Sequence, residues 1–178
     1  MQKIKLRDSE FELFIPSEKI QETVKTMAKR ISEDFQGKNP LFLIVLNGAF
    51  MFASDLLKEI TLTCELSFIK IASYHGTVQK DLKELIGLNE DLTGREIIVV
   101  EDIVDSGKTV KKILEMLKEK NAGKVYIASM FYKPLALQFK DLKVDYVGME
   151  IGNDFIIGYG LDFNGIARNL TSVYRIIE

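Results

Sequence analysis

The sequence predicts an α/β fold in which helices flank a mainly parallel, twisted sheet. Short apolar runs such as residues 41–46 and 97–100 have the near-continuous hydrophobicity of strands that are buried on both faces. They alternate with segments whose apolar residues recur at helical spacing, which is the pattern of parallel strands joined by helices. Ligands bind such sheets at the carboxyl ends of the strands, so the residues that follow each strand are the first candidates for a site.

The first expected helix follows Pro16 and has Ser17 as its N-cap. Gly37 and Pro40 are expected to end it. Its apolar stripe consists of Ile20, Val24, Met27, Ile31 and Phe35. The next expected helix is 49–59, and the expected strands are 41–46, 64–74, 97–100, 125–131 and 146–149. A last helix has the stripe Val110, Ile113, Leu114 and Leu117. Gly123 is expected to cap that helix.

Length and composition describe one ordinary globular domain. The 178 residues suffice for a single well-packed domain, and 47% are hydrophobic and 28% charged. A formal charge of −2, without runs of lysine or arginine, gives no sign of a surface for nucleic acids or anionic membranes. No apolar run is long enough to span a bilayer, and the charged N-terminus does not look like a signal peptide. The single cysteine, Cys64, suits a reducing cytosol.

Residues 97–110 carry the most informative pattern in the chain. Their apolar run ends on two carboxylates, Glu101 and Asp102, and Asp105 then opens a Ser-Gly-Lys-Thr turn before an amphipathic helix. The start of a helix offers N–H groups and a positive dipole end, which suit a phosphate. The carboxylates cannot bind that phosphate, so they would serve hydroxyl groups, a metal ion or a proton. A ligand that carries a phosphate and a diol together, a ribose phosphate, fits this pattern best.

Two other interpretations of this segment are weaker. Residues 107–109 match the end of a P-loop, but that motif requires glycine where this chain has Asp102. Three carboxylates would also repel a triphosphate. In the second interpretation the acids merely end a strand, and Asp105 or Ser106 caps the helix.

The segment 97–110 closely resembles the phosphoribosyl diphosphate signature of the purine phosphoribosyltransferases, in particular of the hypoxanthine (hypoxanthine-guanine) branch. The resemblance spans roughly residues 40–170 and includes a second specific match at 154–163. It implies a type I phosphoribosyltransferase fold, in which the two chain ends form a small hood over the purine. The implied boundaries are a single domain over 1–178, with its core at about 17–150 and its hood at about 1–16 and 151–178.

In that family the signature binds the sugar and its 5′-phosphate. The resemblance implies that Glu101 and Asp102 hold the ribose hydroxyls and that, together with Asp162, they ligate Mg²⁺. Asp105 is the implied general base near N7 of the purine. The implied sugar-phosphate loop is Asp105, Ser106, Gly107, Lys108 and Thr109.

Other segments resemble the loops that handle pyrophosphate and exclude water. The implied pyrophosphate ligands are Leu46, Asn47, Gly48 and Arg168. Asn47 stands where many members have lysine, so a charged side-chain contact is in doubt there. Without the resemblance, Asn47 and Gly48 would indicate no more than a turn. Ser73 and Tyr74 resemble the loop that closes over the site during the reaction and keeps water out.

Three residues are implied to recognise the base. Lys133 would donate to the exocyclic oxygen at purine C6, and this would select 6-oxopurines because an amino group would leave the donor unpaired. Phe155 would stack on the ring, and the backbone of Ile156 would contact the base edge. Without the resemblance, Lys133 could be a surface lysine and Phe155 a core residue.

The implied reaction transfers the 5-phosphoribosyl group from phosphoribosyl diphosphate to N9 of hypoxanthine or guanine, with Mg²⁺ as the cofactor. The expected partners are these substrates and further copies of the chain in a homo-dimer or homo-tetramer, without nucleic acid or membrane. The expected location is the cytoplasm. One alternative is a preference for xanthine, and another is a nucleotide-sensing, RNA-binding regulator on the same fold. The lack of a basic face argues against RNA binding.

Overall fold

The computed structural model describes residues 2–73, 82–86 and 91–177, without the side chains of 72, 73 and 82–86. The helices are α1 (Ser17–Asp34), α2 (Phe50–Glu59) and α3 (Lys108–Glu119). The strands are β1 (Lys3–Leu6), β2 (Ser9–Ile15), β3 (Leu41–Leu46), β4 (Glu65–Ser73), β5 (Leu82–Ile86), β6 (Ile97–Val104), β7 (Val125–Tyr132), β8 (Tyr146–Glu150), β9 (Ile156–Ile157) and β10 (Val173–Ile176).

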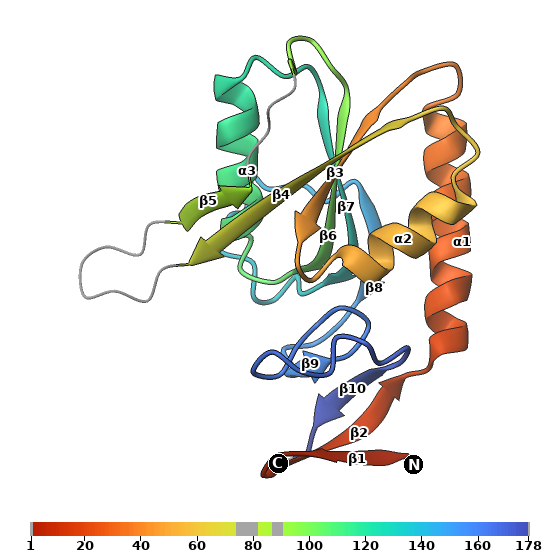
Figure 1. The fold of residues 1–178 in the computed structure, drawn as a ribbon, viewed down its shortest axis with the longest axis vertical. Helices are drawn as coiled ribbons and strands as arrows, with labels where there is room; N and C mark the ends of the chain where they lie inside the picture. Colours follow the sequence, from red (N-terminus) through yellow and green to blue (C-terminus); the bar gives the residue numbers. More distant parts are fainter. Residues whose placement is uncertain (1, 74–81, 87–90, 178) are drawn as a thin grey trace.

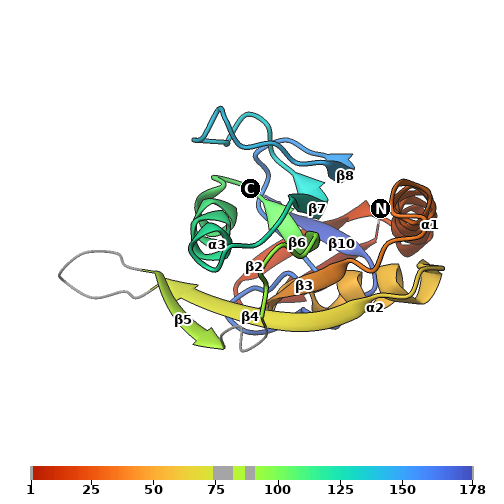
Figure 2. The same cartoon turned by 90° about the horizontal axis from the view of Figure 1, so that it is seen from above.

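The larger sheet has the strand order β5-β4-β3-β6-β7-β8. Its strands β4, β3, β6, β7 and β8 are parallel, and only β5 pairs antiparallel, with β4. Figures 1 and 2 show α1 and α2 on one face of this sheet and α3 on the other. The predicted α/β class, with a mainly parallel sheet between helices, is confirmed.

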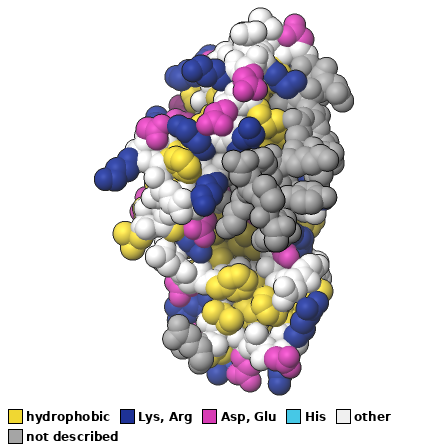
Figure 3. Space-filling view, turned by 90° about the vertical axis from the view of Figure 1, so that its left-hand side faces the viewer, with side chains coloured by type: hydrophobic (Ala, Val, Ile, Leu, Met, Phe, Trp, Pro, Cys, Tyr) yellow, Lys and Arg dark blue, Asp and Glu magenta, His cyan; other side chains and the backbone are white. Residues whose placement is uncertain are grey.

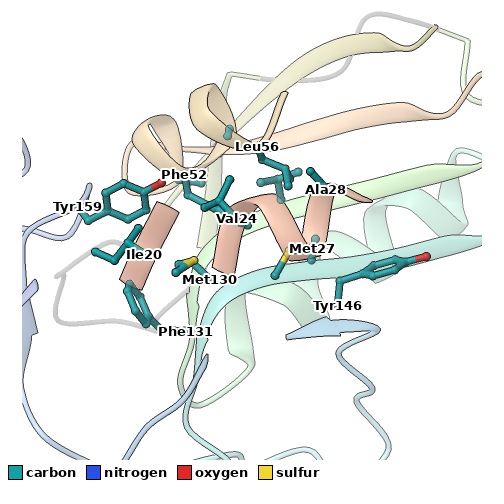
Figure 4. Packing of buried hydrophobic residues seen from close by; sticks show 14 of the residues in the cluster. Ile20, Val24, Met27, Ala28, Phe52, Leu56, Met130, Phe131, Tyr146 and Tyr159 are labelled. Carbon is teal, nitrogen blue, oxygen red and sulfur yellow. The ribbon is translucent and has the colours of Figure 1, made fainter. Parts of the chain in front are cut away.

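Helices on both faces explain why the central strands are apolar along their whole length. On β3, Phe42 and Ile44 pack on the side of α1 and α2, whereas Leu43 and Val45 pack on the side of α3. Figure 4 shows the apolar residues of α1 and α2 meeting Met130 and the neighbouring part of β7. The predicted stripe of α1 is buried, as its helical spacing requires.

The two chain ends form a second, smaller sheet, which we call the hood. Its strand order is β1-β2-β10-β9, and all its pairs are antiparallel. Tyr174 of β10 pairs with Leu13 on one side and with Ile157 on the other, so the beginning and end of the chain share one sheet. Figure 1 shows the hood below the larger sheet, at the end toward which the parallel strands point. The predicted hood of N- and C-terminal segments is confirmed.

Helix α1 begins differently from the prediction. The N-cap position is Pro16, which has no side-chain hydrogen bond, and Ser17 is the first helical residue. The N–H of Ser17 instead donates to the hydroxyl of Ser172, at 3.1 Å, just before β10. A residue from the far end of the chain thus caps the helix, and no local pattern could indicate it.

The prediction that Gly123 caps α3 is wrong. Asn121 adopts the left-handed conformation with φ +53°, and the N–H groups of Asn121 and Ala122 donate to the carbonyls of Lys118 and Leu117. This is the usual C-terminal arrangement of helices, with asparagine in place of glycine. Gly123 is needed for another reason, because an added Cβ would lie 2.5 Å from the carbonyl oxygen of Gly94.

None of the helices in the described part of the chain is long and apolar enough to cross a membrane.

Candidate active site

Two carboxylates that were expected after a strand lie inside one. Strand β6 continues through Glu101 and Asp102 to Val104, because its parallel pairing with β7 extends to Tyr132. The predicted end of this strand at Val100 is therefore wrong by four residues. The longer strand fixes the backbone of both acids in the sheet, where their positions do not depend on a loop.

Glu101 and Asp102 are both buried, with 6% and 8% of their surface exposed. Asp102 Oδ1 accepts from the N–H of Ile103 at 2.9 Å, whereas Glu101 Oε2 has no hydrogen-bond partner within the described residues. Burial and the neighbouring Asp102 raise the pKa of Glu101 well above its usual range, and burial also raises the pKa of Asp102. A buried carboxylate oxygen without a donor is costly, so Glu101 Oε2 suits a ligand that supplies a hydroxyl donor or a cation.

Asp105 follows β6 and is paired with Lys133 from the segment after β7. Lys133 Nζ donates to Asp105 Oδ2 at 3.2 Å, and the lysine side chain is 8% exposed whereas that of the aspartate is 51% exposed. The N–H of Lys133 also donates to the carbonyl of Val104 at 2.9 Å, which aligns the two strand ends. The structure thus brings together the predicted general base and the predicted selector of 6-oxopurines.

The phosphate loop and the start of α3 enclose a cavity of about 250 Å³ that is lined by residues 101–110. Gly107 adopts φ +81°, and an added Cβ would lie 2.9 Å from Leu137, so only glycine fits this turn. The first helical hydrogen bond runs from the N–H of Lys111 to the carbonyl of Gly107. The N–H groups that precede it have no acceptor within the helix, which makes this helix start suitable for an anion. Ser106 and Thr109, which are predicted to bind the 5′-phosphate, line the same cavity.

The predicted pyrophosphate loop lies directly beside the acid pair. Its Leu46–Asn47 peptide bond is cis. An added Cβ on Gly48 would lie 1.7 Å from Asp102 Oδ2, and one on Gly160 would lie 2.0 Å from the carbonyl oxygen of Gly48. Three segments therefore meet at these two glycines: the loop after β3, strand β6 and the hood.

On the hood side, Arg168 and Asp162 form a pair at 2.5 Å. Arg168 also donates to the carbonyl of Gly160 at 2.6 Å, and Asp162 accepts from the N–H of Gly165 at 2.8 Å. Arg168, the predicted pyrophosphate ligand, and Asp162, the predicted metal ligand, are therefore held in place by contacts within the hood.

Phe155 and Ile156 take different positions at the start of β9. The Phe155 side chain is 47% exposed and makes an edge contact with Phe163, with ring centroids 6.1 Å apart. Ile156 is buried at 5% exposure. Figure 3 shows a group of hydrophobic side chains on the hood, whose exposed large hydrophobic residues are Phe155 and Ile166. An exposed aromatic ring on the hood is available for stacking.

The three predicted metal ligands do not form one cluster. Among the described residues, no three His, Cys, Asp or Glu side chains lie close enough to hold a metal ion together. Mg²⁺ is commonly bound by one or two carboxylates, with water and substrate phosphates as its other ligands. The unpartnered Glu101 Oε2 beside Asp102 fits that mode, in which the substrate completes the coordination.

Two predicted residues cannot be placed in the site. Tyr74 lies outside the described residues, as does the side chain of Ser73 at the end of β4. Conversely, Gly160 was not predicted as a site residue, although it forms the contact with Gly48. A signal was present, because Gly158 and Gly160 flank Tyr159 and all three residues have positive φ. Glycines on both sides of an aromatic residue indicate an unusual backbone.

Comparison with known proteins agrees with this geometry. The family described as the phosphoribosyl transferase domain matches residues 16–164. A hypoxanthine-guanine phosphoribosyltransferase of Streptococcus agalactiae is 38% identical over 151 residues, which cover 84% of this chain and 83% of that protein. The bifunctional protein TilS/HprT of Listeria monocytogenes is 34% identical over 160 residues, or 89% of this chain. This chain spans about a quarter of the length of that protein, since the match covers 24% of it.

Solved structures show the same similarity. A hypoxanthine-guanine phosphoribosyltransferase from Bacillus anthracis is 33% identical with a TM-score of 0.87, covering 93% of this chain and 98% of that one. A hypoxanthine phosphoribosyltransferase from Staphylococcus aureus is 30% identical with a TM-score of 0.87, covering 93% and 91%.

Proposed function

The chain belongs to the phosphoribosyltransferase family, and we propose that it transfers the 5-phosphoribosyl group from phosphoribosyl diphosphate to N9 of hypoxanthine and guanine. The products are the purine nucleotide and pyrophosphate. One observation carries the proposal: the buried Glu101, whose Oε2 has no hydrogen-bond partner among the described residues, lies in the same short segment as a helix start and as Asp105, which is paired with Lys133. That segment has a separate feature for a diol, a phosphate and a 6-oxopurine.

The sugar half of the reaction follows from the polar groups of β6 and α3. Glu101 and Asp102 accept hydrogen bonds from the 2′ and 3′ hydroxyls, which gives the unpartnered Oε2 its donor. The N–H groups at the start of α3, with the hydroxyls of Ser106 and Thr109, bind the 5′-phosphate. Together these contacts hold the anomeric carbon at a fixed place above the sheet edge.

The leaving pyrophosphate is held by the loop after β3 and by the hood. Gly48 lies beside Asp102, and Arg168 supplies a guanidinium from the hood. Glu101 and Asp102 would hold Mg²⁺ from the core, and this ion would neutralise charge that grows on the leaving group. Asp162 of the hood, which does not cluster with these two acids, would reach the ion through water.

The base is selected and activated by the Lys133–Asp105 pair. Lys133 is buried and already donates to Asp105, so it can extend the same ammonium group to the exocyclic oxygen of a 6-oxopurine. Asp105 takes or shares the proton of N7 as N9 forms its new bond. Phe155 stacks on the ring and Ile156 contacts its edge through its backbone.

The assay for this proposal uses the purified protein with phosphoribosyl diphosphate, Mg²⁺ and one base at a time. We expect nucleotide and pyrophosphate from hypoxanthine and guanine, and roughly 5- to 150-fold less from adenine. Adenine lacks the oxygen that pairs with the Lys133 ammonium, and this costs about 1–3 kcal/mol in binding. No product from either hypoxanthine or guanine would refute the proposal, and product from xanthine alone would change the substrate class.

We also propose that the chain works in the cytoplasm as a homo-dimer or homo-tetramer. Phe50, Leu66 and Phe68 support this assembly, because these large apolar side chains on α2 and β4 are 44–48% exposed. Leu66 and Phe68 pair with Phe42 and Ile44 of β3, so they lie on the face of the sheet that α1 and α2 cover. Sedimentation velocity of the purified protein tests the proposal, and a monomer at micromolar concentration would contradict it.

A further inference from the structure

A hydrogen bond joins the hood to α2, the helix that follows the pyrophosphate loop. The hydroxyl of Tyr159 donates to Asp55 Oδ2 at 3.0 Å. Tyr159 is 1% exposed, and Figure 4 shows its ring beside Phe52 and Ile20, with the hydroxyl directed toward α2. A buried tyrosine hydroxyl that reaches a carboxylate across two substructures is a specific contact, not incidental packing.

Asp55 is itself held by the core. Gln21 Nε2 of α1 donates to the same Oδ2 at 2.7 Å, and Lys58 Nζ lies 3.2 Å from Oδ1. Burial acts to raise the pKa of Asp55, but the hydrogen bonds from Gln21, Tyr159 and Lys58, with the charge of Lys58, together outweigh it and lower the pKa. The carboxylate is therefore ionised at neutral pH, and a charged acceptor makes the stronger hydrogen bond.

The two residues that form this bond are close in sequence to proposed site residues, Tyr159 in the hood and Asp55 in the core. On the hood side, Tyr159 is three residues after Ile156, and the next residue, Gly160, contacts Gly48 and accepts from Arg168. On the core side, α2 starts at Phe50, immediately after the pyrophosphate loop. One hydrogen bond thus links the two segments that would hold the base and the leaving group.

We propose that Asp55 and Tyr159 are positioning residues whose hydrogen bond fixes the hood over the core and so sets the distance between the purine and the pyrophosphate loop. This role rests on the proposed function, but the bond itself does not touch a substrate. Its loss should therefore change the alignment of substrates and leave the chemical groups of the reaction intact.

The test compares Tyr159→Phe with Tyr146→Phe. Tyr146 on β8 donates to Asp34 of α1 at 2.9 Å and is also buried, so its variant removes the same kind of bond from within the core. Both variants keep the aromatic ring and its packing. We expect Tyr159→Phe to raise the KM for the base roughly three- to tenfold, the value of one hydrogen bond to a charged group after discounting for partial exposure of Asp55. The kcat of this variant should change less than twofold, and Tyr146→Phe should leave the KM unchanged.

A second readout needs no activity. Amide hydrogen exchange of residues 156–161 should be faster in Tyr159→Phe than in the wild type, and unchanged in Tyr146→Phe. Unchanged KM and exchange in Tyr159→Phe, or an equal KM increase in Tyr146→Phe, would overturn the proposal. A wild-type protein without activity on 6-oxopurines would refute the proposed function alone, because the exchange experiment still decides whether Tyr159 fixes the hood. In a double-mutant cycle, adding Asp55→Ala to Tyr159→Phe should raise the KM no further than Asp55→Ala alone.

Discussion

The core and the hood each contribute an acid to the proposed metal and sugar site, and the two are held in opposite ways. Glu101 of the core is buried, and its Oε2 has no partner among the described residues. Asp162 of the hood is 32% exposed in its side chain and is already bound by Arg168 and by the N–H of Gly165. The core acid keeps one oxygen without a hydrogen-bond partner among the described residues, whereas both oxygens of the hood acid have a partner.

This difference indicates where binding energy is gained. An uncompensated buried carboxylate lowers stability in the ligand-free protein and gains most when hydroxyl donors or a cation arrive. A carboxylate with its own arginine has less to gain, and it serves to hold the arginine in place. Asp105 lies between these cases, since within the described part of the chain the partner of its side chain is the ammonium group of Lys133.

The largest expected effect is on turnover, from Asp105→Asn. The amide keeps the shape of the side chain but cannot take a proton, so kcat should fall about 10²- to 10⁴-fold, the usual contribution of a general base. The dissociation constant for phosphoribosyl diphosphate, measured by calorimetry, should stay within about twofold because the amides of the phosphate loop remain.

The matched control is Asp141→Asn. Asp141 also accepts from a lysine, Lys111 at 2.8 Å, but on the surface away from the acid pair. This variant should leave turnover unchanged, since an exposed ion pair contributes little. If Asp105→Asn reduces binding and turnover equally, Asp105 positions the substrate and is not the base.

Features that depend on the local pattern of residues were predictable from the sequence, whereas features that depend on contacts between distant residues were mostly missed. The stripe of α1 and the buried strands β3 and β6 were predictable, because hydrophobic periodicity depends on which face each residue presents. The end of β6 was missed, because its length is set by pairing with β7. The choice of Asn121 over Gly123 as the helix cap was also missed, because both residues favour left-handed backbone.

The candidate site shows the same division. Family resemblance assigned Asp105 and Lys133 separate roles, but their contact across 28 positions of sequence has no local signal. Asp55 was not singled out at all, because one acid on an amphipathic helix is unremarkable until its partner Tyr159 is known. Spatial pairing of distant residues is supplied by the fold alone.

The next effect is on stability, and its sign should differ between the two halves. Glu101→Gln removes a buried carboxyl group that at neutral pH carries either an unpaired charge or a proton held at a free-energy cost, so it should stabilise the ligand-free protein by about 1–3 kcal/mol. Asp162→Asn removes a partly exposed ion pair and should destabilise it by about 0–1 kcal/mol. Urea denaturation without ligands measures both. The Glu101 variant should also bind phosphoribosyl diphosphate more weakly, which would show that the instability is retained for function. A destabilised Glu101→Gln would mean that the carboxylate has a stabilising partner in the folded protein.

The smallest effect is on the pH dependence of stability, and it isolates the core acids from the rest. The pKa of Glu101 is raised above its ordinary value of 4.5. At a pH between 4.5 and the raised pKa, the folded protein holds a proton that the unfolded chain has released. The free energy of unfolding should therefore fall as pH rises. One such proton contributes at most about 1.4 kcal/mol per pH unit. The contribution is fully present below about pH 4.5 and is lost as pH rises through the pKa of the folded state.

Asp102 acts in the same direction, because burial raises its pKa too. Asp55 acts in the opposite direction and at lower pH, since its pKa is lowered from 3.8, and its contribution is common to the wild type and Glu101→Gln. The difference in unfolding free energy between Glu101→Gln and the wild type should therefore widen as pH rises from about 4.5 through the raised pKa of the folded state. A difference that stays constant over that range would show that Glu101 is already ionised in the folded protein, and that the core acid resembles the hood acid after all.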